Sequence, residues 1–380
     1  MACSYNTSTP CRVSYWLWVT VTPTLLAIGT VGNVINVIVL LRRRMRKYST
    51  GVFLLSLALA DICLLWTTAF VFMYESVLGT NVQTFSPVLC KWLPWIRHTS
   101  GGFSVWILVF LTLERMIMTR SLEHTRTKLT TKNAAVASVV LLCFCALYSS
   151  HYFFGTSIQE VRLDNNASEL QCIGTASQFV AFYKTTWPVM VLVGLNLIPI
   201  ALIILGNLTI IVNIIQQRRH LMKIYPANIS NHSTVHKRKS LTKLLFLLCG
   251  FFITTTAPYT ITNVLIVRVK PARTEIENVN EMIFTICFNI LFCNFSFNFF
   301  FYFVSGTLFK QEWRKLLEEC SRVIRNMFIR RNVTELNEPN RTMLQMTSRR
   351  GDILGFRRNV TEPNAPNRTN ARNDVRTDTV

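Results

Sequence analysis

The feature that most constrains this chain is a series of long stretches that contain no Asp, Glu, Lys or Arg. Five of them cover residues 13–41, 133–159, 185–217, 244–267 and 282–309. A sixth stretch, 48–74, is interrupted only by Asp61, and a seventh, 98–113, continues as a helix through Glu114. About 20 apolar residues in a helix cross the hydrocarbon core of a bilayer. The sequence therefore predicts an all-α bundle of seven transmembrane helices.

Charge is distributed unevenly along the chain. Half of the 380 residues are hydrophobic, yet the formal net charge is +21. Of the 40 Lys and Arg residues, 32 lie in the tail or in loops on one side of the predicted bundle, and 8 lie on the other side. Because basic loops stay in the cytosol, we expect a multi-pass plasma-membrane protein with an extracellular N-terminus and a cytoplasmic C-terminus. The basic side would face anionic lipid, and no nucleic-acid partner is needed.

The spans divide the chain into four segments. We expect an extracellular N-terminus (1–14), a seven-transmembrane domain (15–308), a short amphipathic membrane-surface helix (309–320) and a disordered cytoplasmic tail (321–380). The first apolar run is too long for a cleavable signal and is interpreted as a signal anchor. Asn6 and Asn166 begin glycosylation sequons on the predicted outer side, where they could carry glycans.

The predicted membrane-surface helix has one apolar face. Helical spacing places on it Phe309, Trp313, Leu316, Leu317 and Cys320. Basic residues flank this face, which is typical of a helix that lies in the membrane interface. Cys320 is then a candidate for a palmitoyl anchor.

Two cysteines lie on the predicted outer side. Cys90 is at the outer edge of the third span, and Cys172 is in the second outer loop. Both face an oxidising compartment, so we expect a disulfide bond between them. Arg115 follows Cys90 by 25 residues, roughly 37 Å of helix, so the two residues mark opposite faces of the membrane.

Several motifs along the chain resemble those of the rhodopsin-like G-protein-coupled receptors. The motifs that carry the resemblance are GNV (32–34), LALAD (57–61), Glu114-Arg115-Met116, Pro199, Phe252 with Pro258, and Asn298 to Tyr302. Each motif alone is weak, but their order and spacing together are specific. The sequence departs from the family at Thr256, where an aromatic residue is usual, and at Phe299, where proline is usual.

The resemblance implies a conformational switch at the cytosolic face. Glu114 would hold Arg115 in the resting state, and outward movement of the sixth helix at Phe252 and Pro258 would open a site for a heterotrimeric G protein. Tyr302 would stabilise the open state. The family's other partners, receptor kinases and arrestin, would act on the cytoplasmic tail.

The resemblance also implies a sodium pocket and no other cofactor or metal. Asp61 is a carboxylate in the middle of an apolar span, which is unfavourable unless a partner neutralises it. By resemblance, its neighbours are Ser104, Asn294 and Asn298.

Two positions in the sequence argue against two ligand classes of related receptors. Arg97 stands where amine receptors carry Asp, and Phe292 stands where opsins carry their lysine, so neither an amine nor retinal is expected. Arg97 would instead bind a ligand carboxylate, carbonyl or C-terminal amide, or else pair with a loop acid such as Glu75 or Glu169. Other candidate ligand-pocket residues are Tyr259, Asn263, Phe284 and Phe288.

Among family members, the chain is most similar to invertebrate FMRFamide/myosuppressin-like neuropeptide receptors. We therefore expect a short amidated peptide ligand, with a chemosensory receptor of the same fold for a non-peptide ligand as the alternative. A transporter or channel is the alternative class, but seven spans without an evident repeat argue against it. No catalytic motif lies in the spans, so no enzyme is expected. The separation of apolar and basic segments also argues against a soluble enzyme or a disulfide-stapled secreted domain.

Overall fold

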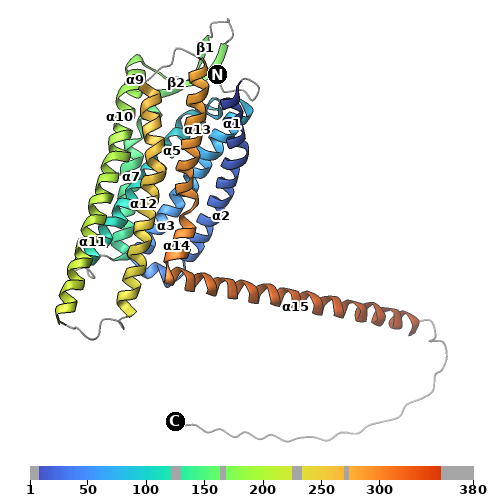
Figure 1. The fold of residues 1–380 in the computed structure, drawn as a ribbon. Helices are drawn as coiled ribbons and strands as arrows, with labels where there is room; N and C mark the ends of the chain where they lie inside the picture. The colour runs from blue at the N-terminus through green and yellow to red at the C-terminus, as the bar shows by residue number, and fades with distance from the viewer. Residues whose placement is uncertain (1–7, 121–129, 163–167, 225–232, 269–273, 352–380) are drawn as a thin grey trace, which may run out of the picture. The chain divides into compact units, whose positions relative to one another are not determined.

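The structure is a computed structural model of the whole chain. It describes residues 8–120, 130–162, 168–224, 233–268 and 274–351. These residues form two compact units, which divide the chain between Leu316 and Leu317. The first unit is a bundle of helices that run side by side, with the ends of successive helices connected by short turns (Figure 1).

The first and second helices of the bundle are each made of three consecutive segments, and the third is one continuous helix. Their bounds are α1 Thr9–Trp16, π-helical η1 Leu17–Val21 and α2 Thr22–Leu40; α3 Ser49–Leu64, π-helical η3 Leu65–Ala69 and α4 Phe70–Leu78; and α5 Pro87–Arg120. Two short 3-10 turns connect them, η2 Met45–Lys47 and η4 Val82–Thr84. The first helix begins at Thr9, before the predicted boundary at residue 15, and Pro10 lies in its first turn, where proline is tolerated.

The remaining elements are further helices and one β-hairpin. Their bounds are α7 Thr131–Tyr148, α8 His151–Gly155, β1 Thr156–Arg162, β2 Ser168–Gly174, α9 Ser177–Ala181, η5 Phe182–Thr186, α10 Trp187–Val191, η6 Leu192–Leu197, α11 Ile198–Ile224, α12 Ser233–Arg268, α13 Thr274–Ser296, α14 Asn298–Ser305 and α15 Thr307–Gly351. The strands β1 and β2 pair antiparallel, with Thr156 opposite Gly174. We call the end of the bundle that carries this hairpin the hairpin end, and the other the opposite end.

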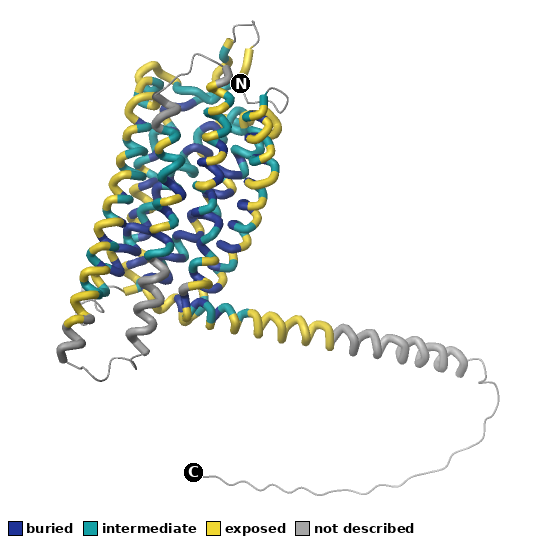
Figure 2. Tube along the Cα trace, in the orientation of Figure 1, coloured by how far each residue is buried: buried dark blue, intermediate teal, exposed yellow. Residues whose placement is uncertain are grey.

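The exterior of the bundle is apolar. Among the described residues, six helices are long and apolar enough to cross a membrane. The seventh is α12, which contains the uncharged stretch 244–267. Buried residues lie on the inward faces of the helices (Figure 2), while large apolar side chains such as Leu147 and Phe154 are 73% and 83% exposed on the outside. Exposure of this kind suits lipid rather than water. The predicted seven-helix bundle is confirmed.

The first and seventh helices approach each other closely. A side chain at Gly29 would place its Cβ 2.8 Å from the Ser296 hydroxyl, so only glycine fits there without a shift. Next to it, the Asn33 amide donates to the Phe295 carbonyl at 2.8 Å, and the Ser296 hydroxyl donates to the Leu25 carbonyl at 3.0 Å. Small residues and interhelical hydrogen bonds are the usual means by which helices associate in a bilayer.

The seventh helix is interrupted where the resemblance places the Asn298–Tyr302 motif. Helix α13 ends at Ser296, Phe297 leaves helical geometry (φ −99°, ψ 4°), and α14 begins at Asn298. The chain bends here even though Phe299 replaces the expected proline. The interruption directs Asn298 into the bundle core, where it is 4% exposed.

Helix α15 extends past the boundary predicted at residue 320. It continues to Gly351, whereas residues 321–351 belong to the segment predicted to be a disordered tail. Residues 321–338 contain neither glycine nor proline, which favours a helix over that part of α15, and Pro339 lies within the helix beyond it. Its described part beyond residue 316 carries exposed apolar side chains, including Ile324, Met327 and Phe328. Residues 352–380 lie outside the described part of the chain.

Candidate functional site

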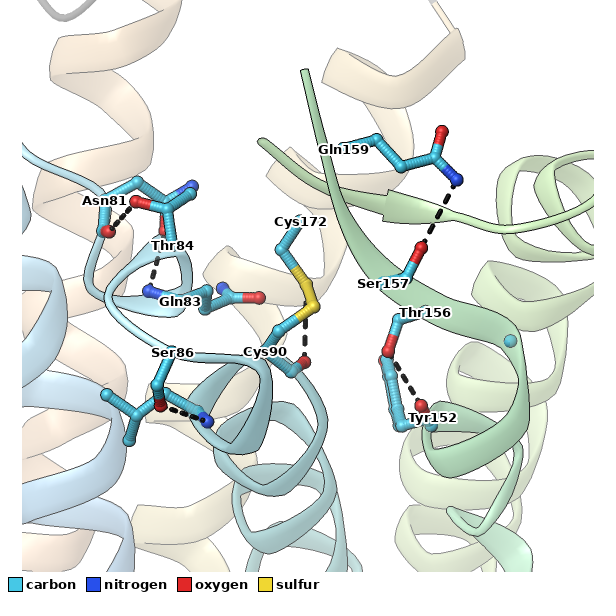
Figure 3. The surroundings of a disulfide bond; sticks show 12 residues. Asn81, Gln83, Thr84, Ser86, Cys90, Tyr152, Thr156, Ser157, Gln159 and Cys172 are labelled. Atoms are coloured by element: carbon cyan, nitrogen blue, oxygen red, sulfur yellow. Dashed lines mark hydrogen bonds between the residues drawn. A yellow bond between two sulfur atoms is a disulfide. The ribbon is translucent and has the colours of Figure 1, made fainter. Parts of the chain in front are cut away.

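A disulfide bond fastens the hairpin to the third helix. Cys90 in the first turn of α5 is bonded to Cys172 on β2, with their Cα atoms 5.6 Å apart (Figure 3). On the other strand, the Thr156 hydroxyl donates to the Tyr152 carbonyl at 2.7 Å, which fixes the start of β1 on α8. The predicted disulfide is therefore present, and it holds the hairpin over one end of the bundle.

Arg97 lies on α5 near this end and is half-buried. Its Nε and Nη2 atoms donate to the Thr67 carbonyl at 3.3 and 3.1 Å, and its guanidinium stacks on the Phe72 ring at 4.6 Å. Glu75 attracts Arg97 electrostatically, but the Glu75 carboxylate accepts a hydrogen bond from the Val82 amide at 3.0 Å. Of the two loop acids considered as partners, the structure thus places Glu75 near Arg97 without a direct ion pair. The arginine retains donor capacity for a further group.

Three predicted pocket residues belong to one aromatic cluster. Tyr259 contacts Phe284 and Phe288, with ring centroids 5.9 and 6.0 Å apart. Phe288 in turn contacts Trp18 at 5.4 Å and Phe72 at 4.9 Å. The stacking of Arg97 on Phe72 joins it to this cluster. Sequence reasoning missed Trp18 and Phe72 because neither belongs to a motif, and only the fold brings the first, second and seventh helices together.

Trp18, a member of the cluster, has a buried Nε1 atom without a hydrogen-bond partner among the described residues, and the same holds for Thr68 Oγ1 and Thr99 Oγ1 on the second and third helices. Trp18 is 2% exposed and packs against Phe72, and Thr68 follows the residue whose carbonyl binds Arg97. Unsatisfied donors are unfavourable in an apolar interior. They favour a binding site for a ligand with hydrogen-bond acceptors. Asn263, the remaining predicted pocket residue, is half-buried on α12.

Asp61 occupies the middle of the bundle and is completely buried. Ser104 donates to its Oδ1 atom at 3.0 Å, and Asn298 donates to its Oδ2 atom at 2.5 Å. These bonds connect α3, α5 and α14. Asn294 is also buried, but the hydrogen bonds that reach Asp61 come from the other two residues. Among the described residues, no basic side chain lies within 4 Å of the Asp61 carboxylate.

Glu114 and Arg115 lie near the opposite end of α5 and are 2% and 7% exposed. The Glu114 carboxylate accepts hydrogen bonds from the hydroxyls of Ser49 and Thr50, the latter at 2.9 Å. Arg115 donates to the Thr50 hydroxyl, while its direct distance to Glu114 is 3.9 Å. The predicted pair is therefore present, and two hydroxyls from the start of α3 complete it. Sequence reasoning missed both hydroxyls.

The other predicted switch residues lie on the sixth and seventh helices. Phe252 is 1% exposed in the core, and Pro258 is inside α12. Tyr302 is equally buried on α14, and its ring contacts that of Phe309 at 5.9 Å. Cys320 is exposed, and Asn6 and Asn166 lie outside the described residues.

A buried carboxylate fastens the start of α15 to the turn after the first helix. Glu312 is 3% exposed, and it accepts hydrogen bonds from Arg42 at 2.9 Å and Lys315 at 3.4 Å. Arg44 lies 3.6 Å from the same carboxylate. Burial raises the pKa of Glu312, but the hydrogen bonds and charges of Arg42 and Lys315 outweigh burial, so its pKa lies below the ordinary value.

Because the pKa of Glu312 is depressed, we expect the free energy of unfolding to fall at acidic pH. Above the ordinary carboxyl pKa, Glu312 is charged and its bonds stabilise the fold; as the pH falls through the folded-state pKa, the stabilisation is lost. We expect Glu312→Gln to lower the melting temperature of the purified protein at pH 7, by an amount that corresponds to about 1.5–3 kcal/mol. The difference in melting temperature between the wild type and Glu312→Gln should disappear at acidic pH. Glu318→Gln, on an exposed part of α15, is the control. A gap that is the same from pH 7 to pH 3 would contradict the assignment.

Comparison with known proteins adds a family match. Residues 32–302 match the family described as 7 transmembrane receptor (rhodopsin family). The chain is 26% identical over 132 residues to C-C chemokine receptor type 1 of Macaca fascicularis, which covers 35% of this chain and 36% of that receptor. It is 30% identical to probable G-protein coupled receptor 34 of Mus musculus over 114 residues, 30% of each chain. It is 28% identical to galanin receptor 2a of Danio rerio over 138 residues, 36% of this chain and 37% of that receptor. The matched region thus spans about a third of the length of these relatives.

Proposed function

Because the chain belongs to the rhodopsin family of seven-transmembrane receptors, we propose that it binds an extracellular peptide and activates a heterotrimeric G protein. Members of this family are receptors rather than enzymes, and the apolar helices make this one a multi-pass membrane protein. In the proposed orientation, the hairpin end faces the extracellular side and the opposite end faces the cytosol. The distribution of 32 against 8 basic residues supports this orientation.

The observation that carries the proposed ligand class is Arg97 on the rim of an aromatic cluster beneath the disulfide-held hairpin. An amidated C-terminus presents carbonyl oxygens that the guanidinium can bind, and an aromatic side chain next to it would pack on Phe72 and Phe288. Two relatives are named for a chemokine and for galanin, which supports a peptide. We propose a short amidated neuropeptide of the FMRFamide kind, with a non-peptide chemosensory ligand as the alternative.

The proposed mechanism is a shift between two packings of the same helices. A ligand that prefers the open packing shifts the population toward it, in proportion to its differential affinity for the two states. Release of Arg115, with movement of α12 at Phe252 and Pro258, would open the cytosolic face to a G protein. Tyr302 is already buried next to Phe309 and would hold the open packing.

A sodium ion at Asp61 is part of the same proposal. The Asp61 carboxylate, the Ser104 hydroxyl and the Asn298 amide oxygen are hard oxygen ligands, which suit an alkali cation. An ion would neutralise a carboxylate that no described basic residue reaches. Ser104 and Asn298 already orient that carboxylate by hydrogen bonds, so these residues fit the group.

We also propose roles for the chain that follows the bundle. Phe309 and Trp313 pack on Phe299 with ring centroids 6.0 Å away, which ties the start of α15 to the seventh helix. Exposed Cys320 lies one helical turn beyond Leu316 and is available for palmitoylation at the bilayer. Phosphorylation of the tail by receptor kinases, followed by arrestin binding, is proposed for threonines whose side chains lie outside the described residues.

The test is a signalling assay in transfected cells. Cells that express the receptor are challenged with a pool of short amidated peptides, and calcium and cyclic AMP are both measured. We expect a dose-dependent response that Arg115→Ala abolishes at equal surface expression, because the arginine is needed to engage the G protein. Arg97→Ala should weaken the response to the active peptide. Lys91→Ala, which removes another basic side chain from the same helix, is the control.

Three results would contradict the proposal in whole or in part. A dose-dependent response of equal size in Arg115→Ala would show that signalling does not pass through this residue. Ion currents that persist in Arg115→Ala would favour a channel. A response to non-peptide odorants, with none to the peptide pool, would replace the peptide by the chemosensory ligand.

A further inference from the structure

The hydroxyl of Thr50 has two hydrogen-bond functions at once. It donates to the Glu114 carboxylate at 2.9 Å and accepts from the Arg115 guanidinium. A hydroxyl has one hydrogen to donate and lone pairs to accept, so both functions are used. Glu114 and Arg115 are themselves 3.9 Å apart, so the hydrogen bonds that connect them run through Thr50.

The fifth and sixth helices carry no acidic residue that could form an ion pair with Arg115. No aspartate or glutamate occurs between residues 170 and 274, a range that includes all of α11, α12 and the segment between them. The first part of α12 carries Lys237, Arg238, Lys239 and Lys243 instead. An acid on the fifth or sixth helix therefore cannot hold Arg115 by an ion pair, and basic residues there would repel it.

The start of α3 is built to present hydroxyls to this pair. Tyr48 is extended (φ −111°, ψ 134°), and Ser49 begins the helix after the η2 turn. A Cβ at Gly51 would lie 2.6 Å from the Met45 carbonyl oxygen, so glycine permits the tight approach of turn and helix. Glu114 thus meets the first turn of α3, where unpaired backbone amides favour a negative charge. Ser49 and Thr50 are 3% and 8% exposed, which keeps water from competing for their bonds.

We infer that Thr50 is the positioning residue that holds Arg115 in the resting receptor, and that the start of the second helix, rather than the sixth, sets basal activity. This inference rests on the proposed function. Ser49 supports Glu114 from the same turn. Activation then requires the arginine to leave the hydroxyl of Thr50, and any change that removes this hydroxyl lowers the barrier to release.

The test compares Thr50→Val, which removes the hydroxyl at nearly constant shape, with Thr50→Ser, which keeps it. Purified receptor in lipid nanodiscs is assayed without ligand for nucleotide exchange on a G protein. We expect basal exchange to rise about tenfold in Thr50→Val, as the loss of a hydrogen bond to a charged group predicts, and to stay near wild type in Thr50→Ser. Thr209→Val removes a hydroxyl that bonds only within its own helix, at 2.8 Å to the Leu205 carbonyl, and is the matched control.

A second readout does not depend on the G protein or the ligand. A fluorophore is attached to Lys243→Cys on α12, in a receptor whose exposed cysteines Cys63, Cys143 and Cys320 are replaced. We expect its spectrum to shift in Thr50→Val toward that of Glu114→Gln, while Thr209→Val and Thr50→Ser stay at the wild-type spectrum. Melting temperatures identify any variant that is merely unfolded.

The outcomes separate the two proposals. If the probe shifts in Thr50→Val but no G protein responds to any variant or ligand, the inference on Thr50 stands and the proposed coupling fails. If the wild-type receptor couples to a G protein but Thr50→Val matches Thr209→Val in both readouts, the inference is overturned. Loss of stability in Thr50→Val without a basal rise, together with an unchanged Glu114→Gln, would likewise overturn it and leave the hydroxyl a structural role.

Discussion

Replacing both cysteines of the disulfide, Cys90→Ser with Cys172→Ser, is expected to abolish ligand binding and to lower the melting temperature substantially. The bond closes a loop of 82 residues, for which the chain-entropy relation gives about 4–5 kcal/mol. It also holds β2 at the hairpin end. Without it, the hairpin loses its covalent link to α5 and keeps bonds such as that from Thr156 to Tyr152, and the cluster around Arg97 loses its cover. The measurement is thermal unfolding and radioligand binding of purified receptor.

Reduction of the wild-type protein provides the matched control. A reducing agent should lower the wild-type melting temperature toward that of the double variant and change the double variant less, because in the double variant only the bond at Cys11 remains to be reduced among the described cysteines. Cys63→Ser, at an exposed free cysteine, should have no effect in either condition. Equal melting temperatures for oxidised wild type and the double variant would show that the bond does not stabilise the hairpin end.

The seven spans could be predicted because each is coded locally, by a run of uncharged residues. The boundaries were less predictable. The first helix begins at Thr9, with Pro10 in its first turn, although Arg12 made that segment look like a loop. The end of α15 was missed because the composition of 321–380 as a whole suggested disorder, while its first part lacks helix-breaking residues.

Contacts between helices limited the prediction of the site. Cys90 and Cys172 could be paired because topology placed both on one side of the membrane. Thr50 and Ser49 could not be assigned, since nothing in their sequence indicates that they meet α5. Trp18 and Phe72 were missed for the same reason. The family resemblance placed Asn294 beside Asp61 together with Ser104 and Asn298, but the observed hydrogen bonds come from Ser104 and Asn298, because a shared level in the bundle does not fix where a side chain points.

Asp61→Ala is expected to destabilise the receptor by about 3 kcal/mol, because it leaves the buried donors of Ser104 and Asn298 without an acceptor. Asp61→Asn should destabilise the receptor less than Asp61→Ala. Its carbonyl can still accept from Ser104, and the Asn298 amide can turn to present its oxygen to the new amide group. The difference in stability between the two variants therefore measures the hydrogen bonds that join α3, α5 and α14. The difference between the wild type and Asp61→Asn measures the effect of the charge. The measurement is thermal unfolding of the purified receptor.

The same variants test the sodium ion, because a buried carboxylate in a bilayer is stable only when a proton, a cation or a polar network compensates its charge. We expect the wild-type melting temperature to be higher in NaCl than in choline chloride at equal ionic strength, since an ion bound only by the folded state stabilises it. The difference should vanish in Asp61→Asn and shrink in Ser104→Ala, which removes one oxygen ligand and keeps the charge. A wild-type receptor with equal melting temperatures in both salts would leave Ser104 and Asn298 as the compensating network, whereas a sodium effect that persists in Asp61→Asn would place the ion elsewhere.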